Sequence, residues 1–229
     1  MIFAHQESVS PRAMRGPESG FSLIELILSL VITLVILGVA VIVYSQALST
    51  RARESSKTDA LVSAQAALNI MSREIGNAGY GLDTNGLGYR DSNNIYHTDC
   101  TQKRLHFRAN SVNTANSTAT DSAGEDITFF YDDTSQSIVR YDPATTAPGT
   151  SGVINRVSDV DFTYFNYTYN AGTGNVDIVS STTPAANTAR VNIKLTVILP
   201  NVQGQPSNQT VTLSSDVNLR NSPFMLGQY

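Results

Sequence analysis

The sequence predicts an α+β protein in which a long N-terminal helix, membrane-spanning in its first half, packs on a head built from an antiparallel β-sheet. Two observations carry this prediction. The apolar run from Leu26 to Val43 contains no charged residue, and as a helix it would cover roughly 27 Å, close to the thickness of a bilayer core. Beyond residue 100, several segments alternate apolar and polar residues with the period of two that half-buried strands show.

Composition limits the function classes that fit this chain. Its 229 residues suffice for one domain plus a long helix. A net charge of −4, with no basic run after the helix, argues against nucleic-acid binding. Cys100 is the one cysteine, so an intrachain disulfide is impossible. The sequence also lacks a Gly-x-Ser-x-Gly elbow, a P-loop and a dinucleotide fingerprint, and we therefore predict neither an enzyme nor a bound cofactor.

The helix is expected to begin near Phe21 and to continue past the apolar run. Residues Ser45 to Asp59 are polar on every side, and such a segment is marginal as a helix on its own. It is followed by apolar residues at steps of three and four, which predict a stripe that packs against the head: Leu61, Ala64, Leu68, Met71, Ile75 and Ala78. Gly76, Asn77 and Gly79 are expected to end the helix.

Six segments in the second half of the chain have the pattern of strands, namely Lys103–Ala109, Asp126–Tyr131, Ser137–Tyr141, Val157–Tyr169, Arg190–Leu199 and Gln209–Leu219. Asp132-Asp133-Thr134-Ser135 reads as a hairpin turn between two of them. Four segments rich in Ser, Thr, Asn and Gly are expected to be loops: Ser111–Gly124, Thr145–Gly152, Ala171–Asn175 and Ser180–Asn187.

The junction before the apolar run reads Gly20-Phe21-Ser22-Leu23-Ile24-Glu25-Leu26. Glu25 is unusual, because an unpaired carboxylate at the edge of a membrane span costs on the order of 3 kcal/mol. The residue therefore needs a positively charged partner. Cleavage of the chain before Phe21 would create an α-ammonium group four residues away, and a neighbouring subunit's ammonium group could then compensate the carboxylate.

This junction resembles the prepilin signature of type IV pilins and type II secretion pseudopilins, which has a short leader ending in Gly, then Phe, a hydroxyl residue, Leu-Ile-Glu and a long apolar helix. The resemblance implies cleavage between Gly20 and Phe21 by a prepilin peptidase, N-methylation of Phe21, and assembly with other major and minor pilins through Glu25. It also implies a single-pass inner-membrane protein with a periplasmic head before assembly, and a filament at the cell surface afterwards.

A second resemblance concerns the end of the helix. The segment Met71–Gly81, with Arg-Glu-Ile followed by Asn-Ala-Gly-Tyr, resembles minor pilins of the PilW type and is similar to the J-type minor pseudopilin, and Val217–Asn221 resembles the end of PilW-type proteins. These likenesses imply a minor pilin-like structural subunit of a type IV pilus that assists filament initiation. The alternatives are a minor pseudopilin of a type II secretion system and an adhesin that uses a pilin-type anchor.

The predicted organisation has four parts: a leader at residues 1–20, a transmembrane and assembly segment at 21–44, a soluble helical half at 45–79, and a β-rich head at 80–229. A conventional secretory signal is a rival interpretation, in which Ser45-Gln46-Ala47 would be the cleavage site and Leu48 the mature start. Its apolar region would be longer than that of a usual secretory signal, which has roughly 7–15 residues, and Glu25 fits poorly inside such a region. A plain membrane anchor is another alternative.

Neither the orientation nor the start of the chain follows from charge or sequence position alone. Arg12 and Arg15 precede the apolar run, while Arg51, Arg53 and Lys57 follow it, so counting cations gives no orientation. Translation from Met14 instead of Met1 would leave a leader of seven residues.

Two acidic or histidine-rich stretches are candidate metal sites. The residue types of His97, Asp99, Cys100 and His106 suit zinc, but we favour a polar loop followed by a strand with His106 facing outward, and predict no metal site. The carboxylates of residues 121–126 and of Asp132 and Asp133 suit calcium, but they lack the EF-hand pattern and are also typical of turns.

One aromatic run offers a candidate binding surface. Its members, which all lie on one predicted strand, are Phe162, Tyr164, Phe165, Tyr167 and Tyr169. They could form an adhesive or stacking surface, but cross-strand packing within the sheet accounts for the same pattern.

Overall fold

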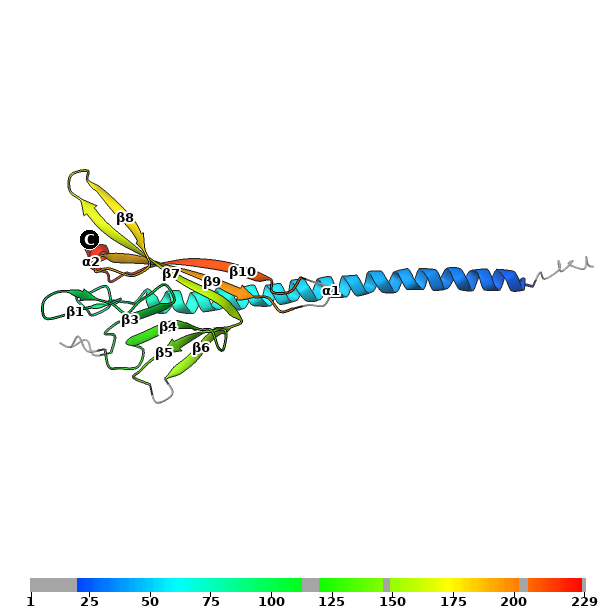
Figure 1. The fold of residues 1–229 in the computed structure, drawn as a ribbon, viewed down its shortest axis with the longest axis horizontal. Coiled ribbons are helices and arrows are strands. Elements are labelled where there is room, and N and C mark those ends of the chain that lie inside the picture. The colour runs from blue at the N-terminus through cyan, green and yellow to red at the C-terminus, as the bar shows by residue number, and fades with distance from the viewer. Residues whose placement is uncertain (1–19, 113–119, 146–148, 202–205, 228–229) are drawn as a thin grey trace, which may run out of the picture. The chain divides into compact units, whose positions relative to one another are not determined.

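The computed structural model describes residues 20–112, 120–145, 149–201 and 206–227, so most of the leader and both candidate start methionines lie outside the described residues. The chain divides into two compact units, Met1–Leu48 and Ser49–Tyr229. Helix α1 (Leu23–Ile75) contributes its first half to unit 1 and its second half to unit 2. Figure 1 shows the elements with their labels.

The first half of α1 is an apolar helix that begins two residues after Phe21. The carbonyl oxygen of Ser22 accepts hydrogen bonds from the amides of Glu25 and Leu26, at 3.0 and 3.1 Å. Within the span, the hydroxyls of Ser29 and Thr33 donate to backbone carbonyls of the preceding turn, at 2.9 and 2.7 Å. The two hydroxyls are therefore paired inside the helix, as side chains in an apolar medium require.

The second half of α1 carries the predicted stripe. Its buried residues in unit 2 are Ala64, Ala67, Leu68, Met71 and Ile75. Ala78 is buried just beyond the helix and Leu61 is half-buried, so the helical period read from the sequence is confirmed. The helix ends at Ile75 and a turn begins at Gly76, as expected.

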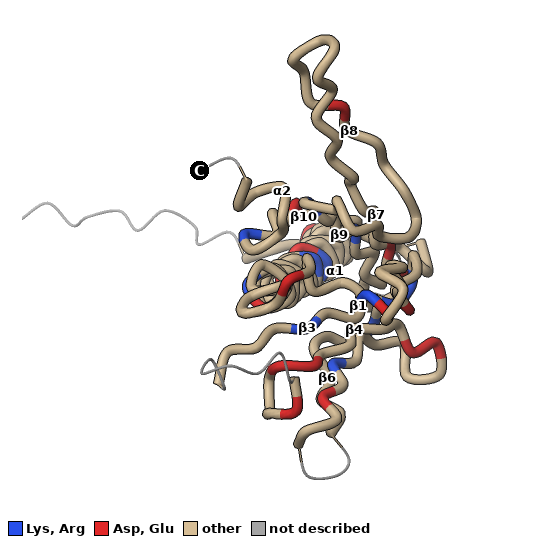
Figure 2. The backbone as a smooth tube through the Cα atoms, turned by 90° about the vertical axis from the view of Figure 1, so that its left-hand side faces the viewer, with Lys and Arg blue, Asp and Glu red and all other residues tan. Residues whose placement is uncertain are grey.

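Two antiparallel four-stranded sheets and one short hairpin make up the rest of unit 2. The first sheet has the order β3-β4-β5-β6 and the second the order β10-β9-β7-β8, while β1 pairs with β2. In both Figure 1 and Figure 2, residues 49–75 of α1 lie between the two sheets, which is why a single stripe of helix residues belongs to one core with both. The strand bounds are β1 Tyr89–Arg90, β2 Tyr96–His97, β3 Arg104–Arg108, β4 Asp126–Asp132, β5 Ser137–Tyr141, β6 Thr150–Asn155, β7 Val157–Asn170, β8 Asn175–Ser181, β9 Thr188–Ile198 and β10 Thr210–Asn218.

All six predicted strands are present with bounds shifted by at most two residues, and the turn between β4 and β5 covers residues 133–136, one residue later than the predicted Asp132–Ser135. The sequence interpretation missed β1, β2, β6, β8 and the short helix α2 (Pro223–Leu226). The loop expected at Thr145–Gly152 was wrong in its last residues, because β6 begins at Thr150. The loops expected at Ala171–Asn175 and Ser180–Asn187 likewise overlap the two ends of β8. Both strands are sheet edges of polar composition, so their pairing partners define them more than their own pattern does.

Asn85 joins the segment after α1 to the second sheet. Its Nδ2 donates to the carbonyl oxygens of Ala185 and Thr188, at 2.8 and 3.2 Å. Its Oδ1 accepts from the amide of Leu87 at 3.1 Å and from the hydroxyl of Tyr96 at 3.0 Å. The side chain is fully buried, and its amide satisfies four groups that would otherwise lose their hydrogen bonds.

Gly86 allows this segment to lie directly against β3. Its φ is +77°, and a Cβ atom there would lie 2.2 Å from the amide nitrogen of Gly79. The close approach lets the amide of Arg108 donate to the Gly86 carbonyl at 2.8 Å, while the amide of Gly79 donates to the Arg108 carbonyl at 2.9 Å. A side chain at position 86 would break this contact.

Candidate functional site

The predicted processing and assembly residues lie at the start of unit 1. Gly20 and Phe21 precede the helix, and Phe21 is 85% exposed. A Cβ atom at Gly20 would meet no other atom within 4 Å, so the described residues leave this peptide accessible. Glu25 is exposed in the first turn of α1, where the helix dipole favours a negative charge. The three residues are thus exposed and close in sequence, which their predicted roles require.

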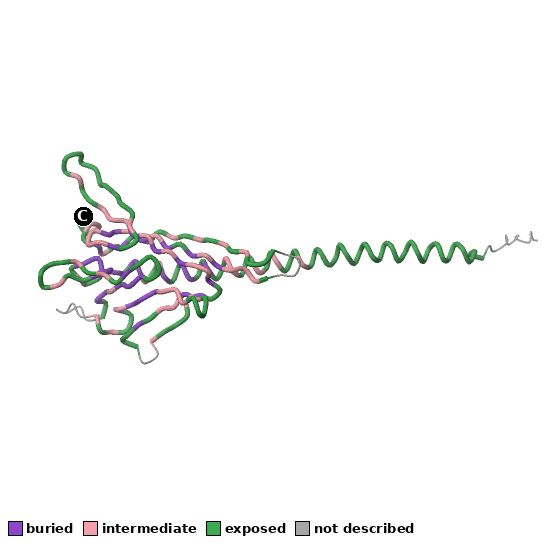
Figure 3. Tube along the Cα trace, in the orientation of Figure 1, coloured by how far each residue is buried: buried purple, intermediate pink, exposed green. Residues whose placement is uncertain are grey.

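The helix surface around these residues is apolar on every side. All residues from 20 to 48 are exposed, as Figure 3 shows for this half of α1. The most apolar 18-residue window of α1 has a mean hydropathy of 3.2, and none of it is buried. By length and composition α1 is the one described helix able to cross a membrane. An apolar surface of this extent requires lipid or other helices as neighbours.

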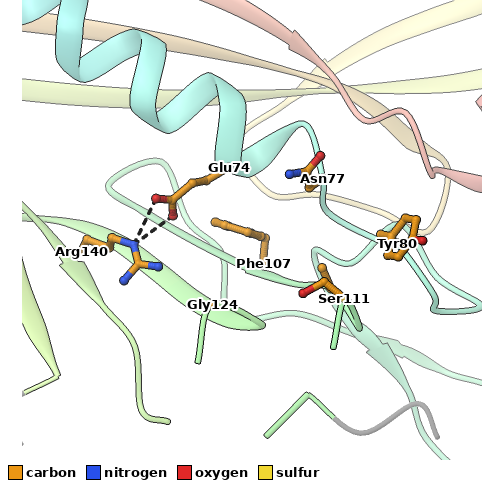
Figure 4. Close-up of a pocket in the computed structure, with 8 residues that line it drawn as sticks. Glu74, Asn77, Tyr80, Phe107, Ser111, Gly124 and Arg140 are labelled. Carbon is orange, nitrogen blue, oxygen red and sulfur yellow. Dashed lines mark hydrogen bonds and ion pairs between the residues drawn. The ribbon is translucent and has the colours of Figure 1, made fainter. Parts of the chain in front are cut away.

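A pocket of about 540 Å³ opens at the end of α1 in the head (Figure 4). Glu74 and Asn77 come from the end of the helix and the turn after it, Tyr80 follows, and Phe107 and Arg140 come from β3 and β5. Ala109, Ser111 and Gly124 complete the lining. The pocket therefore lies where the helix end meets the first sheet.

An ion pair that the sequence analysis did not identify spans one wall of this pocket. The guanidinium Nε of Arg140 donates to both carboxylate oxygens of Glu74, at 2.9 and 3.3 Å. The Nη1 atom of Arg140 lies 3.5 Å from Asp142, which also accepts the Gly124 amide at 2.8 Å. The Arg140 guanidinium is therefore held by two carboxylates, and its ion pair with Glu74 links the helix to β5. The signal available in the sequence was the charged residue 74, which occupies the packing side of an otherwise apolar stripe.

The candidate zinc residues do not form one cluster. His97 Nε2 lies 3.1 Å from Asp91, on the β1–β2 hairpin. His106 instead lies between Asp99 and Asp126, with its Nδ1 atom 2.7 Å from Asp99 and its Nε2 atom in hydrogen-bond contact with Asp126. Among the described residues, no group of three or more His, Cys, Asp or Glu side chains is arranged to hold a metal ion.

The structure also corrects the alternative interpretation of His106. Its side chain is nearly buried, not outward-facing in solvent, because the two carboxylates cover it. Each ring nitrogen thus contacts one carboxylate, Nδ1 that of Asp99 and Nε2 that of Asp126. Cys100 is buried beneath it, and its thiol donates to the His106 carbonyl at 3.1 Å. Burial raises the pKa of this thiol, which makes it unreactive.

Two of the candidate calcium carboxylates, Asp132 and Glu125, accept hydrogen bonds from backbone amides. Asp132 accepts the Thr134 amide at 3.1 Å, in the turn between β4 and β5. Glu125 accepts the amides of Val112 and Ser111, both at 2.7 Å, and these bonds lower the pKa of Glu125. Asp132 and Glu125 thus serve as turn and loop acceptors, whereas Asp126 pairs with His106 and Arg108 on β3.

The aromatic run divides between the core and the surface. Phe162 and Tyr164 are fully buried. The Phe165 ring lies under the guanidinium of Arg190, 4.0 Å from its centroid, and Tyr167 contacts Phe224 of α2 with ring centroids 5.0 Å apart. Tyr169 alone is mostly exposed, at 64%. Cross-strand and inter-element packing therefore explains all but one of these residues.

Comparison with known protein families matches residues 15–41 to the prokaryotic N-terminal methylation motif. No curated protein and no solved structure matches the chain. The matched segment includes Gly20, Phe21 and Glu25 and the first part of the exposed apolar helix. Together with the α+β layout of a long helix packed on antiparallel sheets, it indicates a structural subunit that is anchored in a membrane before assembly. Residues 15–41 thus carry the N-terminal signal of type IV pilins and pseudopilins.

Proposed function

We propose that this protein is a minor pilin-like subunit of a type IV pilus that assists filament initiation and assembly. The observation that carries the proposal is the methylation motif at 15–41, which continues into a helix with an exposed apolar surface. A soluble domain would bury such a surface, whereas a subunit of a helical filament exchanges membrane lipid for neighbouring helices. Before assembly the chain is then an inner-membrane protein with a periplasmic head.

In this proposal, a prepilin peptidase cuts between Gly20 and Phe21 and the new amine of Phe21 is methylated. Each mature subunit then carries an ammonium group and, four residues later, the carboxylate of Glu25. In an assembly with an axial step, the ammonium group of one subunit meets Glu25 of another. Desolvation offsets much of the attraction between them, so the pair contributes more to axial register than to affinity.

The minor role rests on the two segments that resemble PilW-type proteins, and their contact supports treating them as one feature. Asn221, at the end of the second segment, donates from Nδ2 to the carbonyls of Asn77 and Ala78 in the first, both at 3.4 Å. A Cβ atom at Gly76 would lie 3.8 Å from Val217. Residues far apart in the sequence therefore form one surface at the end of α1.

The mature N-terminus tests the processing step. Mass spectrometry of the protein from its native host should find a chain that begins with N-methylated Phe21. Replacing Gly20 with Leu should leave an uncut precursor in the membrane, while the same change at Gly38, inside the helix, should be cut normally. A mature chain beginning at Leu48 would instead establish the secretory-signal interpretation.

The assembly role of Glu25 is tested separately. Glu25→Leu should still insert and be cut, since the junction and apolar run remain. Its recovery with partner pilins from sheared filaments should fall about tenfold, equivalent to about 1.4 kcal/mol, because the variant lacks the contact that sets its axial register. Glu54→Gln, which also removes a carboxylate exposed on α1, is the matched control and should assemble normally. Equal recovery of Glu25→Leu and wild-type protein would show that the carboxylate has no such role.

A minor pseudopilin of a type II secretion system is the second candidate, because the methylation motif supports both kinds of subunit. The two differ in the complex that the head joins. Affinity isolation of the full chain from membranes should recover pilus subunits under the first proposal and secretion pseudopilins under the second. An adhesin role would require filaments that assemble normally in its absence but no longer adhere.

A further inference from the structure

The first residues of unit 2 carry an unusual group of cations. Arg51, Arg53 and Lys57 all lie within nine residues after Leu48, where unit 1 ends. None of the ion pairs between described residues includes any of the three. Cations that have no carboxylate partner among the described residues and closely follow a membrane span are positioned, along the sequence, to meet the phosphate groups of lipids.

Two of these cations line a built hollow in unit 2. Arg53 and Lys57 are one helical turn apart and therefore share a face of α1. They line a hollow of about 330 Å³, whose other lining residues are one that follows β9 and three at and just before the start of β10: Leu199, Gln209, Thr210 and Val211. Arg53 is partly positioned already, because its Nη2 atom donates to the side-chain oxygen of Gln209 at 3.4 Å.

The residues that line this hollow suit a phospholipid headgroup better than a free anion. The two cations and the polar groups of Gln209 and Thr210 provide donors for a phosphate, while Leu199 and Val211 provide apolar surface for the adjoining glycerol and acyl carbons. The neighbouring carboxylates, Glu54 and Asp59, are not part of this lining. Side chains on a helix also lean toward its N-terminus, which is the direction of the apolar run along the chain.

We propose that Arg53 and Lys57, with the β9–β10 side of the hollow, bind the anionic headgroup of a membrane phospholipid while the subunit is anchored in the bilayer. The site goes beyond filament assembly and does not depend on it, since it requires only the membrane-anchored state. It holds the head against the bilayer surface until the subunit is extracted, and extraction into a filament then breaks the contact.

The test uses the full chain in phosphatidylcholine bilayers that contain a phosphatidylglycerol with a photoreactive headgroup. After illumination, peptide mass spectrometry should map the attached lipid to residues 49–60 and 206–213. Arg53→Gln with Lys57→Gln should raise the phosphatidylglycerol content needed for half-maximal attachment about 25-fold, at about fivefold for each cation. The control Arg73→Gln with Arg220→Gln removes two other exposed cations and should leave attachment unchanged.

Salt provides a measurement on the wild-type protein that no folding defect can affect. Attachment should weaken as sodium chloride is added, because screening weakens contacts between exposed charges. Equal attachment of the Arg53 and Lys57 variant, an equal loss in the control, or equal attachment of a photoreactive phosphatidylcholine would each overturn the proposal. Displacement of the lipid by inorganic phosphate would assign the site to a free anion and would overturn it as well. None of these outcomes affects the mature N-terminus, which tests the pilin-like function independently.

Discussion

The two halves of α1 have the same backbone conformation but differ in whether the rest of the chain covers their apolar residues. From Leu23 to Leu48 the apolar residues surround the helix and remain exposed. From Ser49 to Ile75 they narrow to one stripe, which is buried against two sheets. Helices in proteins gain most of their stability from packing an apolar face. The second half of α1 therefore has its packing partner within its own chain, whereas the first half requires a bilayer or other subunits.

The largest expected effect comes from placing the same charge in each half. Leu68→Asp puts an unpaired carboxylate in a fully buried site and should destabilise the head by about 4 kcal/mol or more. Leu34→Asp, at an exposed position in the apolar half, should leave the head's stability unchanged. Its cost appears in the membrane, where insertion of the span should become less favourable by about 3 kcal/mol.

Urea unfolding of the full chain in detergent, followed by the near-ultraviolet signal of its tyrosines, measures the first effect, and an insertion assay measures the second. Leu68→Asp should be the more damaging variant in the unfolding assay, and Leu34→Asp the more damaging one in the insertion assay. If Leu68→Asp melted at the wild-type midpoint, the stripe would not be the packing face. If Leu34→Asp lowered the midpoint of the head, the two halves would not be independent.

The sequence predicted α1 and six of the strands because periodicity is a local property. The helical stripe and the alternation of Val191, Ile193 and Leu195 with polar residues in β9 can be recognised in the sequence without knowing which elements pack against them. Strands β6 and β8 were not predicted, because their Ser, Thr and Asn residues are also typical of loops. Their pairing with β5 and β7 is what identifies them as strands. The exposed Gly20-Phe21-Glu25 segment was predicted from a contiguous motif, and its roles stay predictions.

Contacts between residues far apart in sequence could not be predicted in the same way. Glu74 meets Arg140 across 66 positions, and Lys103 meets Asp161 across 58. His106 was expected in solvent because β-strand alternation places it opposite Leu105 and Phe107, but Asp99 and Asp126 cover that side. No pattern within β3 reports what the preceding loop and the neighbouring strand bring to the other face.

A middle-sized effect should come from a carboxylate whose partner lies within unit 2. Burial acts to raise the pKa of Asp126, but the hydrogen bonds and charges of His106 and Arg108 outweigh it and lower the pKa below the ordinary 3.8. A lowered folded-state pKa means that this carboxylate stabilises the head above about pH 4 and that the contribution is lost as pH falls through the folded-state pKa. Asp126→Asn should therefore cost about 1–3 kcal/mol at neutral pH and progressively less below pH 4.

Urea midpoints measured from neutral pH down to acid pH check this prediction. Asp83→Asn, which changes an exposed carboxylate, is the matched control and should follow the wild-type protein throughout. If the loss of stability in Asp126→Asn stayed constant down to the lowest pH, the ionised form of Asp126 would not be what stabilises the head. Glu25 offers the contrast in unit 1, where the proposed partner belongs to another subunit and head stability should not respond to it.

The smallest effect is expected at Lys103, which links the two sheets of the head across exposed surface. Its ammonium group donates to Asp161 at 2.6 Å and also contacts Asp159, both on β7. Burial acts to lower the pKa of Lys103, but the bonds and charges of the two aspartates outweigh it and raise the pKa above 10.5. The stabilisation is therefore fully present below about pH 10.5 and is lost as pH rises through the folded-state pKa.

Lys103→Met keeps the length of the aliphatic stem and removes the charge, so the variant isolates the ion pairs. Because Lys103 and Asp159 are about half exposed, we expect a loss below about 1 kcal/mol in low salt that shrinks further in high salt. The buried contacts nearby, such as the Tyr164 hydroxyl donating to the Thr101 carbonyl at 3.0 Å, should hold the sheets together without it. A loss of several kcal/mol, unaffected by salt, would show that the exposed ion pairs, and not the shared core around α1, join the two sheets.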